Sequence, residues 1–173
     1  MTNRIQKREF LNAELLKLLR VADFGRRYLH CYTTLASRYP RGDHSADPQV
    51  VRKILSESIL PFRYFRKERF FGYIDRRHGY DVLLHVTIRR STVEFALFVS
   101  SKVGVIGGQW SKLAHQAVKG DDAEVAVGHE TRGLPFDSED SLRQIIEGAV
   151  DLFGHAKDLI CAHFDRLPEV VES

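Results

Sequence analysis

The residues of this chain that could do chemistry include eight histidines and two cysteines. A zinc site needs such ligands at short, fixed spacing, and no pair of histidines shows H-x-H or H-E-x-x-H spacing. His155 and His163 share one predicted helix but lie about two turns, roughly 12 Å, apart, which is too far to hold one small ion. We therefore predict no metal site and interpret the histidines as hydrogen-bonded or solvent-facing side chains.

The nucleophile arrangements of known enzyme classes are missing from the sequence as well. Cys31 and Cys161 lack C-x-x-C spacing, and because each lies in an apolar helical pattern we expect two buried, reduced thiols. There is no G-x-S-x-G elbow, and the glycine-rich segment 104–108 lacks the Lys and Ser/Thr of a phosphate-binding loop. We predict a protein that is not an enzyme and takes no cofactor. The alternative is an acid–base role for His85, beside Asp81 and Thr87.

Basic and aromatic residues are interleaved in segment 63–74, RYFRKERFFGYI. This mixture suits single-stranded nucleic acid, whose bases stack on rings and whose phosphates pair with cations. Residues 69–74 partly resemble the aromatic strand motif of the RRM family, but Phe70 replaces the expected Gly and Arg76 replaces the final aromatic residue. The order of elements also differs, because three predicted helices precede the first clear strand. One hypothesis is a nucleic-acid-associated protein that uses residues 63–73, and the other is a first strand with core and turn aromatics.

Helices are predicted at both ends of the chain. Residues 1–20 carry an amphipathic stripe, residues 23–38 carry a second, and Asp47-Pro48 starts a third helix that Pro61 stops. A long helix capped by Asp137 or Ser138 has an apolar face that could lie across a sheet. The stripe of the first helix consists of Ile5, Phe10, Leu11, Leu15, Leu18 and Leu19.

In the middle third the apolar period changes from about four to two, which is typical of strands. Segments 69–75, 80–88, 93–99 and 103–106 are joined by short turns, so we expect an antiparallel meander that Gly107-Gly108 ends before a short helix at 110–118. Residues 125–127 could add an edge strand. One face of the sheet is apolar and must be covered, and the other is mixed and faces water or a partner. The predicted fold class is α+β, with N-terminal helices, a central antiparallel β-meander of about four to five strands, and a long C-terminal amphipathic helix packed on the sheet.

Length and composition predict a single α+β domain that spans residues 1–173. The hydrophobic content of 43% is enough to form a core without disulfide or metal crosslinks. The net charge of +3, from 26 Lys and Arg against 23 Asp and Glu, permits an anionic partner without demanding one. Charged residues interrupt segment 1–20, and no stretch approaches the ~20 apolar residues of a transmembrane helix, so we expect a cytosolic protein. The oligomeric state stays open.

Three features between Phe70 and Phe164 occur in the same order as in a known group of proteins. They are the meander of residues 80–99, the Gly107-Gly108-Gln109-Trp110 step into a short helix, and Leu134-Pro135-Phe136 before the terminal helix. This part, a little over half of the chain, resembles small immunity proteins of bacterial contact-dependent inhibition and polymorphic toxin systems. The resemblance implies a non-enzymatic protein that binds one toxin domain tightly and blocks its active site. Immunity proteins against nucleases are often acidic, so the slightly basic charge argues against a nuclease target.

The candidate partner-binding residues come from the turns and the mixed face of the predicted meander. Protein interfaces use a few aromatic or Arg anchors, which electrostatic steering supports. For the single Trp, a core position after Gly-Gly is the competing interpretation. The candidates are Tyr73, Arg76, Arg77, His78, Asp81, His85 and Trp110.

Overall fold

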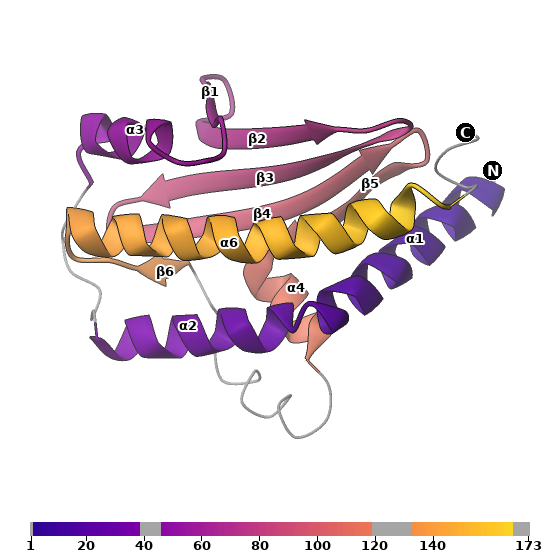
Figure 1. Ribbon diagram of the computed structural model, residues 1–173, viewed down its shortest axis with the longest axis horizontal. Coiled ribbons are helices and arrows are strands. Elements are labelled where there is room, and N and C mark those ends of the chain that lie inside the picture. Colours follow the sequence, from indigo (N-terminus) through magenta and orange to yellow (C-terminus); the bar gives the residue numbers. More distant parts are fainter. Residues whose placement is uncertain (1, 39–45, 119–132, 168–173) are drawn as a thin grey trace.

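The protein consists of one sheet with helices packed on it (Figure 1). The structure is a computed structural model that describes residues 2–38, 46–118 and 133–167. The helices are α1 Thr2–Val21, α2 Phe24–Arg38, α3 Pro48–Ser56, α4 Trp110–Ala117 and α6 Glu139–Phe164. The strands are β1 Arg63–Phe65, β2 Phe70–Arg76, β3 Tyr80–Arg89, β4 Thr92–Ser101, β5 Gly104–Gln109 and β6 Leu134–Pro135.

The strands form one antiparallel sheet in the order β1-β2-β3-β4-β5, so each strand pairs with its neighbour in sequence. The short β6 pairs with the start of β4, where Thr92 lies opposite Pro135. The predicted α+β class, the meander and the long C-terminal helix are therefore confirmed.

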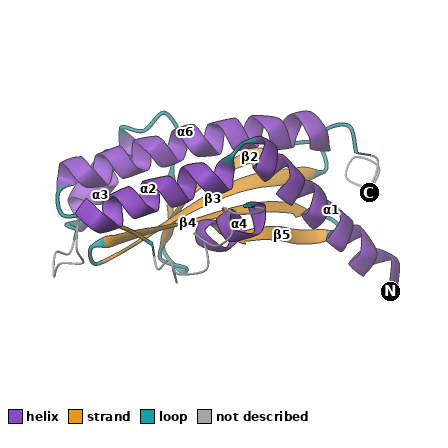
Figure 2. Ribbon diagram, turned by 90° about the horizontal axis from the view of Figure 1, so that it is seen from below, coloured by secondary structure: helices purple, strands orange, loops and turns teal. Residues whose placement is uncertain are grey.

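One face of this sheet forms the wall of the hydrophobic core. Alternate residues of β3 and β4 are buried, among them Leu84 and Leu97, because successive side chains of a strand point to opposite faces. The long helix α6 lies over these residues and contributes Phe153 and Phe164, both fully buried. Viewed from below, the helices lie on one side of the sheet (Figure 2). No helix of the described segments covers the opposite face.

Side-chain caps set the starts of two helices. Asp47 caps α3, where its Oδ1 accepts a hydrogen bond from the backbone N–H of Gln49 at 2.8 Å, and Pro48 occupies the first helical position. Ser138 and Ser141 form a reciprocal capping box at the start of α6. Both caps match the signals in the sequence.

A charged contact joins the first and last helices. Glu14 of α1 is nearly buried, with one carboxylate oxygen 2.8 Å from Nε2 of His163 on α6, while the other pairs with Lys17. These partners hold the pKa of Glu14 below its ordinary value, and the hydrogen bond from Lys17 is the largest cause. The ionised carboxylate therefore contributes to the packing of α1 against α6.

Some side chains of the predicted helices lie elsewhere than expected. Ile5 and Phe10 are 63% and 42% exposed, because the buried face of α1 is formed by residues later in the helix. Cys31 is exposed, so the prediction of two buried thiols is wrong for this one and confirmed for Cys161. Helix α3 ends at Ser56, before Pro61 could stop it.

The sheet also contains strands that the sequence did not predict. Residues 63–65 form β1, and residues 134–135 form β6. Gly107 and Gly108 do not end the meander but pair within β5, opposite Phe98 and Leu97. The candidate edge strand at 125–127 lies outside the described residues.

Gly107 should be essential to the pairing of β4 with β5. Its φ of +95° is unfavourable for other residues, and a Cβ built on it would lie 2.2 Å from the carbonyl oxygen of Leu97. We expect Gly107→Ala to lower the free energy of unfolding by about 2 kcal/mol or more. Gly108→Ala is the matched control, since a Cβ there has nothing within 4 Å. Equal chemical-denaturation midpoints for the two variants would contradict this account of β5.

The Glu14 contact should make part of the stability depend on pH. Because the pKa of Glu14 is lowered in the folded state, its stabilisation is complete above the ordinary value of 4.5 and disappears as the pH falls through the lowered value. We expect Glu14→Gln to cost about 1 kcal/mol at pH 7 and progressively less as the pH falls below 4.5. Urea unfolding at several pH values measures this difference. Glu9→Gln removes a carboxylate from an exposed position of the same helix and is the matched control, and an equal cost in the two variants at pH 7 would contradict the role of the Glu14 contact.

Candidate functional site on the open face of the sheet

The face of the sheet opposite the helices, here called the open face, carries side chains of mixed chemistry. These residues alternate with the core positions of β3 and β4 and are half-buried because no described helix covers them. The register places them beside residues of β1, β2 and β5, so the face spans five strands. On the two central strands it consists of Asp81, Leu83, His85, Thr87, Glu94, Ala96, Phe98 and Ser100.

Four rings cross the open face diagonally from β1 to β4 and form what we call the aromatic row. Phe65 stacks on Phe70 with ring centroids 4.8 Å apart and planes 16° apart. Phe70 stacks on His85 at 4.1 Å and 20°. His85 meets Phe98 edge to face at 5.0 Å. The row is thus one continuous set of ring contacts that links four strands.

Gly72 provides the space that the row needs on β2. It lies opposite Arg63 on β1 and His85 on β3, so its α-carbon belongs to the open face. A Cβ built there would lie 2.9 Å from the ring of Phe65 and 3.0 Å from that of Phe70. The missing side chain therefore lets two rings lie over the strand.

Burial lowers the pKa of His85 below its ordinary value of 6.5. The cause is loss of water around the imidazole, whose neighbours include Phe70 and Phe98. The ring is neutral at pH 7 and keeps one N–H donor and one acceptor. His85 therefore adds a polar group to an otherwise apolar row without adding charge.

A hollow of about 600 Å³ lies beside the aromatic row. Thr87 and Ala96 contribute small side chains to its lining. Charged and amide groups surround it, so a side chain entering the hollow would meet apolar rings and several hydrogen-bonding groups. Its lining includes Glu68, Arg69, Phe70, His85, Thr87, Arg89, Glu94, Ala96, Phe98 and Gln109.

The ring orientations determine which kinds of contact the row can make. One face of Phe70 is against Phe65, and the other is against His85. A base that stacks on a protein ring needs a free ring face. Phe70 therefore has no free ring face on which a base could stack.

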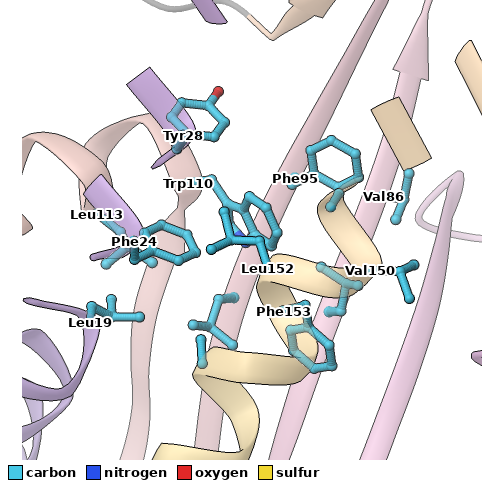
Figure 3. Packing of buried hydrophobic residues seen from close by; sticks show 14 of the residues in the cluster. Leu19, Phe24, Tyr28, Val86, Phe95, Trp110, Leu113, Val150, Leu152 and Phe153 are labelled. Carbon is cyan, nitrogen blue, oxygen red and sulfur yellow. The ribbon is translucent and has the colours of Figure 1, made fainter. Parts of the chain in front are cut away.

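Two of the predicted site residues, Tyr73 and Trp110, lie on the helix side of the sheet. Tyr73 is opposite Leu84 and meets Phe153 of α6 edge to face at 5.9 Å. Trp110 is 1% exposed and packs against Phe24 and Phe95 (Figure 3), so its competing interpretation as a core residue is correct. Neither contributes to the open face, because the strand period and the start of α4 direct both inward.

The other predicted residues divide between the open face and the β2–β3 turn. Arg76 and Asp81 lie opposite each other at the turn end of the open face, away from the hollow. Arg77 pairs with Asp75 at 3.1 Å, and His78 is exposed in the turn. Only His85 lies in the aromatic row.

The remaining members of the row could be found only in part from sequence. Strand alternation had placed Phe98 on the same mixed face as His85. Phe65 and Phe70 belong to the basic and aromatic segment, but nothing in that segment indicated that two of its rings would stack over Gly72. That contact depends on the pairing of β1 with β2, which was not predicted.

The arrangement offers little for catalysis or metal binding. Asp81 is four residues from His85 along β3, about 13 Å, so the suggested acid–base pair is not in contact. No hydrogen bond joins His85 to Thr87 within the described segments. Among those same segments, no group of three His, Cys, Asp or Glu side chains could hold a metal ion.

Removing the ring of Phe70 should raise the pKa of His85. Phe70→Ala exposes one face of the imidazole to water, and burial is the cause of the lowered value. An NMR titration of the His85 ring protons measures the shift toward 6.5. Ile74→Ala, on the same face of the same strand, is the control and should leave the titration unchanged. An unchanged or lower pKa in Phe70→Ala would contradict the stacking.

Comparison with protein-family models, with curated proteins and with solved structures finds no match to the chain. No helix in the described part is long and apolar enough to cross a membrane.

Proposed function

We propose that the chain is a non-enzymatic binding protein of the immunity type, which binds a cognate toxin domain through its open face and blocks it. The observation that carries the proposal is the aromatic row, half-buried on a face that no described helix covers. Apolar ring area on a protein surface favours contact with another macromolecule, because burial of that area removes it from water.

The chemistry of the face favours a protein partner. Interfaces concentrate binding energy in a few aromatic and Arg residues that a more polar rim surrounds. Here the rings of Phe70 and Phe98 adjoin a hollow whose rim carries Arg69, Arg89 and Gln109. A side chain of the partner that entered the hollow would contact ring edges and still find hydrogen-bonding groups at the rim.

The rings are also fixed in position before any partner binds. Phe65, Phe70 and His85 restrain one another by stacking, and β-strands hold all three. A binding surface that is already ordered loses less conformational entropy on association. Preorganisation of this kind favours the tight inhibition of one target that we propose for this chain.

A nucleic-acid-associated function is the second candidate, and the cations next to the row favour it. Arg66, Lys67 and Arg69 are exposed in and beside the β1–β2 turn. Against it, both faces of Phe70 are occupied, and Glu94 contributes a carboxylate to the lining of the hollow, which would repel phosphate. We therefore rank it below protein binding.

Replacing a ring of the row by a charge should abolish partner binding. A tagged chain expressed in its native host should retain a protein in stoichiometric amount, and Phe98→Asp should reduce that retention by roughly tenfold or more, as for an interface hot spot. Ile59→Asp is the control, because Ile59 is 88% exposed and lies in a separate hollow between α3 and α6. Expression of the retained protein alone should arrest growth of a test strain, and co-expression of the unchanged chain should restore growth.

Two results would contradict the proposal. One is the absence of any stoichiometric protein together with retention of RNA, which would favour the second candidate. The other is an equal loss of partner retention in Phe98→Asp and Ile59→Asp while circular dichroism shows that both variants are folded. Either result would remove the open face as a protein-binding site.

A further inference from the structure

Two turns come together at one end of the open face. The β1–β2 turn, residues 66–69, leads into Phe70, and Arg89 ends β3 next to Arg90 of the β3–β4 turn. Phe71 lies opposite Val86, so the two turns are at the same end of the sheet. Arg69 of the first turn and Arg89 at the end of β3 both line the hollow beside the aromatic row.

This end of the sheet, here called the cationic end, concentrates positive charge. Its five cations are all exposed, and within the described residues none of them forms an ion pair. Glu68 is the one carboxylate in the two turns. The cations are Arg66, Lys67, Arg69, Arg89 and Arg90.

Several cations elsewhere on the surface are neutralised locally. Arg27 pairs with Asp151 at 2.9 Å, and Arg143 pairs with Glu57 at 2.7 Å. Arg77, in the turn at the other end of the sheet, pairs with Asp75. The cationic end differs because, in the part of the chain that the structure describes, its cations have no ion-pair partner, although the whole chain carries only +3.

We propose that the cationic end receives an acidic patch of the protein partner, which then covers the aromatic row. This inference rests on the proposed function and adds the partner's chemistry. Charge complementarity selects this partner, because unpaired guanidinium groups bind carboxylates in planar, often bidentate geometry. Glu68 and Glu94 also line the hollow and would repel a phosphate backbone that crossed it.

Local backbone geometry fixes where three of these residues leave the sheet. Arg69 and Arg90 adopt left-handed conformations, with φ of 56° and 51°, in the tight turns. The hydroxyl of Thr92 donates a hydrogen bond to the carbonyl oxygen of Arg89 at 2.9 Å. Steering by such a patch raises the association rate and weakens as salt screens it.

The test uses a short labelled poly-glutamate peptide as the acidic probe and an oligouridylate of equal charge as the nucleic-acid probe. Fluorescence anisotropy at low salt should show that the unchanged chain binds the peptide. The triple variant Arg66→Glu, Lys67→Glu and Arg89→Glu should bind it roughly tenfold or more weakly. All three substitutions avoid the left-handed positions.

A second triple variant, Arg8→Glu, Lys102→Glu and Arg166→Glu, is the matched control. It makes the same change in net charge at the other end of the sheet. Lys102 lies in the β4–β5 turn, the Arg8 side chain is 3.7 Å from a Cβ built on Gly104, and Arg166 follows Asp165, whose carboxylate accepts a hydrogen bond from Tyr80 at the start of β3. Poly-glutamate affinity within about twofold of the unchanged chain is expected, because the remaining effect is screened net charge.

An equal loss of poly-glutamate affinity in the two triple variants would overturn the inference. Absence of peptide binding by the unchanged chain at low salt would also overturn it. Tighter binding of the oligouridylate than of the peptide would also overturn it, in favour of nucleic acid. Failure of the proposed function can be distinguished from failure of this inference, because the proposed function is tested by partner capture with Phe98→Asp and the inference is tested by binding of the two probes. If that capture depends on Phe98 but the cationic-end variant captures equally well, the inference fails and the proposed function stands.

Discussion

One-sided burial of the sheet is the constraint on which the rest of the structure depends. The meander has one face of uniformly apolar side chains, and α6 with its neighbouring helices removes that face from water. The helices lie on the same side, so the side chains that alternate with the core form a second surface. The open face therefore follows from the same strand period that builds the core.

The two surfaces differ in how their side chains are held. Core residues such as Leu84 and Phe153 are fixed by close packing from several elements. The rings of the aromatic row have no covering layer in the described part and are held mainly by one another and by the gap at Gly72. A partner would meet a surface that is already ordered but still has apolar area to bury.

The sequence predicted the elements better than it predicted the site. Alternation over residues 80–99 identified both faces, and Asp47 and Ser138 marked where two helices begin. Sequence could not show that Phe65 and Phe70 stack, because that contact needs the unforeseen pairing of β1 with β2. Tyr73 was predicted as a binding residue for a related reason. It lies on the helix side because its strand pairs Tyr73 with the buried Leu84, and that register cannot be derived from composition.

The left-handed turns of the cationic end suggest a compromise between folding and function. Glycine adopts such a backbone freely, whereas a residue with a Cβ is less stable there by about 1 kcal/mol. The chain places arginine at both positions, 69 and 90. Glycine at either position would relieve this strain, so each arginine keeps a guanidinium group at this end of the sheet at a cost in the stability of the fold.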